Sequence, residues 1–253
     1  MIINKRLEEL KIILIERLKD TEWSNPEYFD YLWMNGLRIK TFHLLEPKSE
    51  LKILDIGCGD GWFSIQNALI FRDIYFIGID LYEAEEAKKN AQLFKLKNCI
   101  FMMMDAYKMD FKEEFDAAIL FFSLGNICSR KEDLINLFSK IKRALRVRGK
   151  ILIAEPFQEN FKEYNKLKKL YEISKLHGKG EEKETILSQR DVLNVLKKLN
   201  FEILKIIKHN FTWRTSIEEF LKYFKLKELP FKIKEFYYRD KPKQVTIIIA
   251  QKQ

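Results

Sequence analysis

The stretch Leu51-Lys-Ile-Leu-Asp-Ile-Gly-Cys-Gly-Asp-Gly-Trp-Phe-Ser64 decides the fold of this chain. A short apolar run of strand type leads directly into three glycines at alternate positions, Gly57, Gly59 and Gly61, and a helical pattern follows them. Glycine lets the backbone turn tightly and lets a ligand lie against main-chain atoms. The stretch therefore predicts a strand, a ligand-facing turn and a helix in direct succession.

Downstream of this unit, short apolar runs alternate with amphipathic segments. The expected strands are residues 52–57, 75–80, 99–105, 115–122 and 150–155, and the expected helices include 83–96 and 132–145. The second of these helices follows Ser129-Arg-Lys-Glu132, which fits a capping box. Near-continuous apolar strands separated by helices indicate an α/β fold with a parallel sheet covered on both faces.

The region before the first strand reads as helical. Apolar residues recur there at helical spacing, namely Leu7, Leu10, Ile13, Leu14 and Leu18. A second helix is expected from Asn25, as N-cap, toward Pro47.

The C-terminal third adds strands and two aromatic, lysine-rich segments that we interpret as caps over the carboxyl ends of the strands. In chain order, it contains a cap at 157–187, a helix opened by Ser188-Gln-Arg-Asp191, a strand at 201–208, a cap at 210–242 and a strand at 244–252.

Three of the predicted strands end at or beside an acidic residue: Asp55, Asp80 and Asp105. The carboxyl ends of parallel strands meet at one edge, where open α/β sheets bind their ligands. Asp80 follows Gly61 by nineteen residues, and in nucleotide-binding βαβ units an acid near that spacing accepts hydrogen bonds from ribose hydroxyls. Its two carboxylate oxygens suit an unphosphorylated ribose.

These motifs resemble those of the class I S-adenosylmethionine-dependent methyltransferases, closely over residues 51–155 and by element order elsewhere. Asp55-Ile-Gly-Cys-Gly-Asp-Gly61 matches that family's first motif, Ile77-Gly-Ile-Asp80 its second and Met104-Asp105-Ala106 its adenine-contact motif. Arg148-Gly149 stands where the family usually has Pro-Gly-Gly, a departure that affects a turn.

The resemblance implies a Rossmann-like class I methyltransferase fold. This fold is a seven-stranded, mostly parallel sheet with helices on both faces, supplemented here by N-terminal helices and helical cap insertions. The last strand would be antiparallel, and the two C-terminal strands would be neighbours at one edge. One methyltransferase domain would cover residues 1–253, divided into an N-terminal helical segment (1–47), a cofactor-binding core (48–156) and the caps with the C-terminal strands (157–253).

The resemblance also implies S-adenosylmethionine as cofactor, S-adenosylhomocysteine as product and no metal. The implied cofactor-binding residues follow the first four strands: Asp55, Gly57, Cys58, Gly59, Gly61, Asp80, Leu81, Asp105, Ala106, Phe122 and Ser123. Asp55 and the backbone around Gly57 and Gly59 would hold the methionine part. Asp80 would bind the ribose, Leu81 would lie against the adenine ring, and Asp105 would accept from the adenine amine. No catalytic residue is assigned, because positioning the acceptor in line with the S–CH₃ bond does much of the work.

Two other classes compete with this interpretation. A nicotinamide dinucleotide fold also uses a glycine-rich first turn, but its Gly-x-Gly-x-x-Gly pattern would need a glycine where this chain has Trp62. A non-catalytic cofactor-binding subunit is the other alternative. The intact glycine motif and the acids argue against it, although they indicate binding rather than turnover.

The methyl acceptor is less well marked. The Asn/Asp-Pro-Pro-aromatic motif of enzymes that methylate nucleobase amines is absent after the fourth strand. Leu124-Gly-Asn126 is similar to a segment of glycine N-methyltransferase relatives, which nominates Asn126 as an acceptor-site residue. Tyr28 and Trp33 are further candidates, and together with the aromatic caps they predict a small-molecule or cofactor-like acceptor. Lysines in the caps favour an anionic one.

RNA is the alternative partner, because the chain carries a net charge of +9 and six cations without an acid between Lys140 and Lys150. The basic, aromatic residues 201–243 would then form the docking surface. No recognisable RNA-binding module accompanies them.

Composition narrows the remaining choices. No apolar stretch approaches the roughly 20 residues of a membrane helix, so no membrane partner is expected. Three cysteines without Cys-x-x-Cys spacing, and three scattered histidines, predict neither a disulfide framework nor a metal site. The expected location is the cytoplasm, and the oligomeric state is left open.

Overall fold

A computed structural model of the protein describes residues 2–24, 32, 34–128, 130–160, 187–211 and 243–253. The helices are α1 (Ile2–Leu18), α3 (Leu37–His43), α4 (Trp62–Ile70), α5 (Ala84–Leu93), α6 (Leu124–Ile127), α7 (Lys131–Ala144) and α9 (Gln189–Lys198), with 3-10 turns at Glu22–Ser24, Met34–Gly36 and Gln158–Asn160. The strands are β1 (Lys52–Ile56), β2 (Tyr75–Asp80), β3 (Cys99–Met103), β4 (Phe115–Phe121), β5 (Leu145–Glu155), β6 (Phe201–Phe211) and β7 (Lys243–Lys252).

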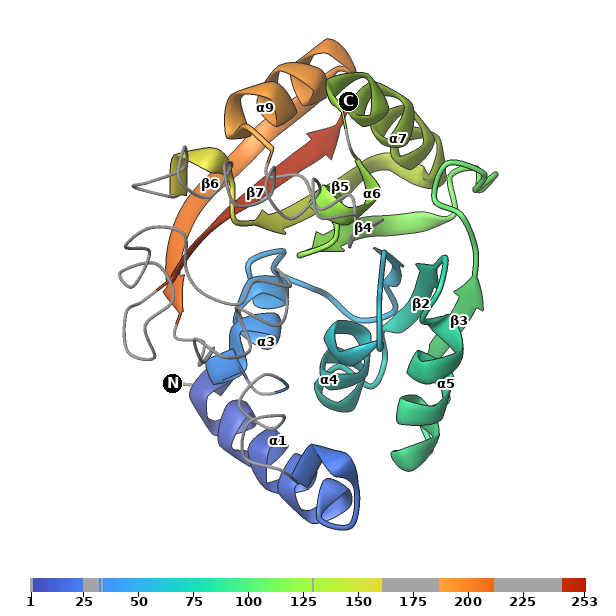
Figure 1. The fold of residues 1–253 in the computed structure, drawn as a ribbon, viewed down its shortest axis with the longest axis vertical. Helices are drawn as coiled ribbons and strands as arrows, with labels where there is room; N and C mark the ends of the chain where they lie inside the picture. The colour runs from blue at the N-terminus through green and yellow to red at the C-terminus, as the bar shows by residue number, and fades with distance from the viewer. Residues whose placement is uncertain (1, 25–31, 33, 129, 161–186, 212–242) are drawn as a thin grey trace, which may run out of the picture.

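The strands form one seven-stranded sheet in the order β3-β2-β1-β4-β5-β7-β6 (Figure 1). The first five strands are parallel to one another, and β7 is antiparallel to both β5 and β6. This confirms the predicted mostly parallel sheet and the pairing of the two C-terminal strands. The strand order reverses between β1 and β4, the place where open α/β sheets bind ligands.

Helices cover both faces of the sheet, as predicted. α4 and α5 pack on one face, and α7 and α9 on the other (Figure 1). Side chains alternate along a strand, so adjacent residues of β1 point to opposite faces of the sheet. Ile53 belongs to the hydrophobic cluster under α4, and Leu54 belongs to the cluster under α7.

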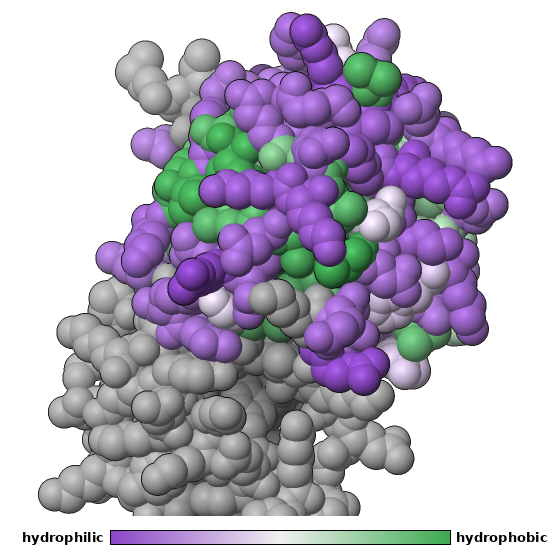
Figure 2. Space-filling view, turned by 90° about the horizontal axis from the view of Figure 1, so that it is seen from above, coloured by the Kyte–Doolittle hydropathy of each residue, from purple (hydrophilic) through white to green (hydrophobic). Residues whose placement is uncertain are grey.

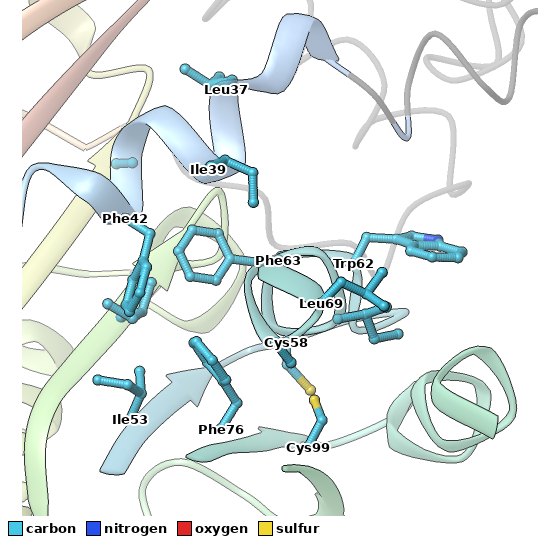
Figure 3. Packing of buried hydrophobic residues seen from close by; sticks show 14 of the residues in the cluster. Leu37, Ile39, Phe42, Ile53, Cys58, Trp62, Phe63, Leu69, Phe76 and Cys99 are labelled. Carbon is cyan, nitrogen blue, oxygen red and sulfur yellow. The ribbon is translucent and has the colours of Figure 1, made fainter. Parts of the chain in front are cut away.

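α1 and α3 form an outer layer against α4. Four leucines of α1 at helical spacing are buried, namely Leu7, Leu10, Leu14 and Leu18. Phe42 of α3 lies with its ring centre 6.3 Å from that of Phe63 in α4 and 5.3 Å from that of Phe76 in β2 (Figure 3). The N-terminal helices are thus part of the core that supports the glycine turn.

The boundaries of β5 and α7 differ from the prediction. β5 begins at Leu145 rather than Lys150 and passes through Arg148, whose φ is +60°. The turn expected at Arg148-Gly149 is therefore an irregularity within a longer strand, and the register against β4 shifts there. The N-cap of α7 is Arg130, one residue later than predicted. The Arg130 amide donates a hydrogen bond to the Asp133 carboxylate at 2.9 Å.

Several expected elements lie outside the described residues. These are the start of the second helix at Asn25 and most of both cap segments, residues 161–186 and 212–242. The described part of that second helix is not continuous with its expected course, because α3 begins only at Leu37, after a 3-10 turn and Gly36 with φ of +69°. Within the described part of the chain, every helix is too short or too polar to cross a membrane.

Candidate active site

The glycine turn after β1 has a backbone that only glycine adopts readily. Gly57, Gly59 and Gly61 have φ of +67°, +52° and +85°. The amides of Gly57 and Cys58 both donate to the backbone oxygen of Ile79, which ties the turn to β2. A Cβ atom on Gly57 would lie 2.7 Å from Cβ of Ser123, so the turn also rests directly on the end of β4.

Asp55 lies beneath this turn. Its side chain is 1% exposed, and Oδ2 accepts a hydrogen bond from the Ser64 hydroxyl at 2.6 Å. Burial raises the pKa of Asp55 to about 7, against the effects of that hydrogen bond and of nearby Arg38. Asp55 therefore ties β1 to α4, the two elements that the glycine turn connects.

The pKa of Asp55 is higher in the folded state than in the unfolded chain, so binding a proton at Asp55 stabilises the folded state. This stabilisation is greatest below about pH 4, where Asp55 is protonated in both states. That contribution is lost as the pH rises through about 7. Asp55→Asn should therefore flatten the fall of the unfolding free energy between pH 4 and 8 and stabilise the protein at pH 8 by about 1–2 kcal/mol. Urea titrations at several pH values measure the unfolding free energy. If its decrease between pH 4 and 8 were the same in Asp55→Asn as in the wild-type protein, the prediction would be contradicted. Asp60 is still present in Asp55→Asn, and burial raises its pKa to about 6, so it should keep part of the pH dependence in the variant.

Asp80 at the end of β2 holds the turn from the other side. Oδ2 accepts a hydrogen bond from the Gly59 amide at 3.0 Å, and Oδ1 accepts bonds from the amides of Tyr82 and Glu83 at 2.8 and 2.9 Å. Leu81, the next residue, is 45% exposed. The predicted ribose and adenine residues are therefore adjacent to the glycine turn.

The end of β3 lies beside Asp80, since the Met104 amide donates to the Asp80 backbone oxygen at 2.9 Å. The carboxylate of Asp105 accepts a hydrogen bond from the Tyr107 amide at 2.9 Å, and Ala106 is buried. The structure thus brings Asp55, Asp80 and Asp105 to one edge of the sheet.

The end of β4 completes the edge. Phe122 is half-buried, with its ring centre 4.6 Å from that of Phe121. Ser123 is buried, and its hydroxyl donates to the Ile56 backbone oxygen at 2.7 Å, so it braces β4 against β1. Asn126, in α6, is exposed beside them. The Leu124 amide at the start of α6 donates to the buried Glu155 carboxylate at 2.5 Å.

Cys58 packs inward, as a small buried residue. Burial raises the pKa of its thiol far above the ordinary value. Its side chain points toward that of Cys99 at the start of β3 (Figure 3). Cys58 therefore contributes its backbone to the turn rather than a nucleophile.

Arg38 of α3 is a buried charge near Asp55 and Asp60 that the sequence analysis did not single out. Its side chain is 4% exposed, its Nη1 donates to the Leu32 backbone oxygen at 2.5 Å, and its guanidinium carbon lies 5.7 Å from the ring centre of Phe121. The charge of Arg38 lowers the pKa of both Asp55 and Asp60, although burial outweighs it at each. The sequence signal that could have indicated a buried charge is the position of Arg38 between Leu37 and Ile39, in the last helix before β1.

Two predicted acceptor residues, Tyr28 and Trp33, lie outside the described residues. Among the residues that the structure describes, no three histidine, cysteine or acidic side chains converge to hold a metal ion.

Two of the six cations at 140–150 form ion pairs with acids, and two others donate to backbone carbonyl oxygens: Lys142 to Leu199 and Lys150 to Leu45. Arg143 pairs with Asp110 at 2.5 Å, and Arg146 pairs with Asp116 at 2.7 Å. A hollow of about 540 Å³ beside these pairs lies away from the glycine turn and is lined by Lys112, Glu113, Ser139, Lys142, Arg143, Leu199 and Lys252. Hydrophilic side chains cover much of the face seen from above, where α7 and α9 lie (Figure 2). The run is thus partly neutralised by acids, which weakens its use as an RNA-docking argument.

Comparisons with known proteins agree with this architecture. A family model described as a methyltransferase domain matches residues 47–212. A curated carboxy-S-adenosyl-L-methionine synthase from Helicobacter pylori is 30% identical over 135 residues, which are 53% of this chain and 55% of that protein. The chain therefore spans about half the length of this relative.

Solved structures share the fold at low identity. A SAM-dependent methyltransferase from Methanosarcina mazei has a TM-score of 0.59 and 19% identity, covering 83% of this chain and 96% of that one. Geranyl diphosphate C-methyltransferase from Streptomyces coelicolor has a TM-score of 0.62 and 16% identity, with coverages of 94% and 84%. Phosphoethanolamine N-methyltransferase 2 from Haemonchus contortus has a TM-score of 0.61 and 20% identity, with coverages of 91% and 59%.

Proposed function

Because the chain belongs to the methyltransferase domain family and uses S-adenosylmethionine, we propose that it transfers the methyl group of this cofactor to a small-molecule acceptor. The observation that carries the proposal is that the glycine turn after β1 lies beside Asp80, with Asp105 at the end of the neighbouring strand, at the edge where open α/β sheets bind ligands. The bound cofactor supplies an electrophilic methyl group on a sulfonium centre. The protein then has to orient the acceptor and exclude water.

The residues predicted for the cofactor divide by their surroundings. Asp80 and Asp105 present carboxylates at the edge, where they suit the ribose and the adenine amine. Asp55 and Ser123 hold the turn in place through the hydrogen bonds to Ser64 and Ile56. We assign these two a supporting role, and assign the contact with the methionine part to the backbone at Gly57 and Gly59.

Arg38 suits the carboxylate of the cofactor's methionine part. Its guanidinium is fixed by the Leu32 carbonyl and by packing against Phe121, next to the glycine turn. A guanidinium matches a carboxylate with two parallel hydrogen bonds. Arg38 would therefore hold the end of the cofactor opposite the adenine.

The acceptor is proposed to enter beside Phe122 and Asn126, next to the methionine end of the cofactor. Two of the named structural relatives act on small phosphate-bearing molecules, geranyl diphosphate and phosphoethanolamine. An anionic small molecule is therefore the acceptor class that we favour. The RNA alternative depends mostly on residues 212–242, which lie outside the described residues.

The test is a cell extract incubated with the protein and with S-adenosylmethionine labelled on its methyl carbon. Mass spectrometry should find the label in a small molecule and not in the RNA fraction. Asp80→Ala is the matched control, because loss of hydrogen bonds to a charged group should weaken cofactor binding by about 1.5–3 kcal/mol and reduce labelling. Label confined to RNA would favour the alternative, and the absence of any turnover would favour the non-catalytic subunit.

A further inference from the structure

The carboxylate of Asp80 has little capacity left for a ligand. A carboxylate offers about four lone-pair sites. Oδ1 already accepts two backbone amides, those of Tyr82 and Glu83, and Oδ2 accepts the Gly59 amide. About one acceptor site therefore remains on Oδ2, whereas a ribose presents two hydroxyl donors. Asp80 alone cannot accept both without breaking a hydrogen bond that holds the turn.

A second carboxylate lies against the same glycine. Oε2 of Glu83 is 3.1 Å from the position that a Cβ atom on Gly59 would occupy. The Gly59 amide thus donates to the Asp80 carboxylate, and the Glu83 carboxylate lies beside the Cα atom of the same glycine. Burial and the neighbouring Asp80 raise the pKa of Glu83, in agreement with two acids at close quarters.

The Glu83 carboxylate is not engaged elsewhere in the described part of the chain. Glu83 is the N-cap of α5, but its side chain makes no capping hydrogen bond. The next two acids of the helix differ: Glu85 pairs with Lys88 at 2.6 Å, and Glu86 pairs with Lys89 at 2.9 Å. Glu83 is therefore the acid of this helix start that has acceptor capacity and faces the glycine turn.

We propose that Glu83 completes the ribose subsite, accepting one hydroxyl of the cofactor ribose while Asp80 accepts the other. The inference rests on the proposed function, because it assigns a residue to the cofactor site given there. Two hydroxyl protons placed between the carboxylates would also reduce the repulsion between Asp80 and Glu83. Glycine suits this position because its φ of +52° is left-handed and because a Cβ atom would enter the space beside the Glu83 carboxylate.

The experiment is titration calorimetry of S-adenosylhomocysteine and its 2′-deoxy and 3′-deoxy analogues against the wild-type protein and Glu83→Ala. Loss of a hydrogen bond to a charged group should raise the Kd for S-adenosylhomocysteine about 10- to 100-fold. For one of the two deoxy analogues, Glu83→Ala should bind as the wild-type protein does, because the hydroxyl that Glu83 accepts is missing. Glu85→Ala, on the outer side of the same helix start, should leave all three Kd values unchanged.

Thermal unfolding without ligand checks that the variants are folded, and Glu83→Gln, which keeps one acceptor oxygen, should lose less affinity than Glu83→Ala. An unchanged Kd for S-adenosylhomocysteine in Glu83→Ala would overturn the assignment. An equal loss for all three ligands would also overturn it, since Glu83 would then act on the turn and not on a hydroxyl. Failure of the wild-type protein to bind S-adenosylhomocysteine would overturn the proposed function together with this inference.

Discussion

Gly61→Ala is expected to lower the free energy of unfolding by about 2–5 kcal/mol. Gly61 is the N-cap of α4 with φ of +85°, a region that costs other residues roughly 1–2 kcal/mol. A Cβ atom there would lie 2.8 Å from both Cβ of Ala87 and Cζ of Phe101. Overpacking of this kind in a well-filled core costs about 1–3 kcal/mol more.

Guanidinium denaturation of the wild-type protein and the variant measures this change. The double variant Gly61→Ala/Phe101→Leu separates the two causes, because leucine lacks the ring atoms that the new methyl group meets. The coupling energy of the double-mutant cycle should be favourable, while the strain from φ remains. A midpoint unchanged in Gly61→Ala would show that the turn can relax away from α5 and β3.

Arg38→Met is expected to raise the Kd for S-adenosylmethionine by about 30- to 1,000-fold. The variant keeps much of the side-chain length, but it removes the guanidinium that we assign to the methionine carboxylate. Losing one partner of a buried, charge-assisted contact costs roughly 2–4 kcal/mol. Asp55 and Asp60 would also lose the positive charge that lowers their pKa values.

A ligand without the carboxylate distinguishes this role from a structural one. 5′-Methylthioadenosine keeps the adenine and the ribose but lacks the amino acid part, so its affinity should be nearly equal in the wild-type protein and Arg38→Met. Arg38→Lys should recover part of the affinity for S-adenosylmethionine, because it keeps the charge without the fork of donors. A comparable loss for both ligands in Arg38→Met would mean that Arg38 supports the turn rather than binding the cofactor.

Much of the fold could be predicted because its signals are local. The expected strand at 75–80 coincides with β2, and the expected helix at 132–145 differs from α7 by one residue at each end. Apolar runs and helical periodicity are properties of neighbouring residues. The start of β5 is not local: residues 145–149 include two arginines and a glycine, and they join the strand through pairing with β4, as Leu145 opposite Phe115 shows.

The site divides in the same way. The glycine turn and the acids at the strand ends were visible as motifs, and the structure places Asp80 and Asp105 on adjacent strands. Arg38 and Glu83 were missed, because their relevance depends on contacts with Phe121 and Gly59, far away in the chain. The hydroxyl of Ser123 could not be recognised as a brace, since its partner is the backbone oxygen of Ile56 on another strand.

The charge pattern illustrates why a run of one sign is weak evidence. Six cations between Lys140 and Lys150 suggested an anionic partner. In the folded protein, Arg143 pairs with Asp110, which precedes β4, and Arg146 pairs with Asp116, which lies in β4. Exposed pairs of this kind add little stability, but they reduce the field that a polyanion would meet.

The position of β7 has a consequence for the order in which this sheet can form during synthesis. β7 leaves the ribosome after β6, yet it lies between β5 and β6. The parallel strands β1 to β5 can assemble while the rest is still being made. Among the described strands, however, the neighbour of Ile151, Leu152 and Ile153 on one side is β7, which is made last. A nascent chain stalled before residue 243 would carry that apolar edge exposed, and such edges are sites of aggregation and chaperone binding.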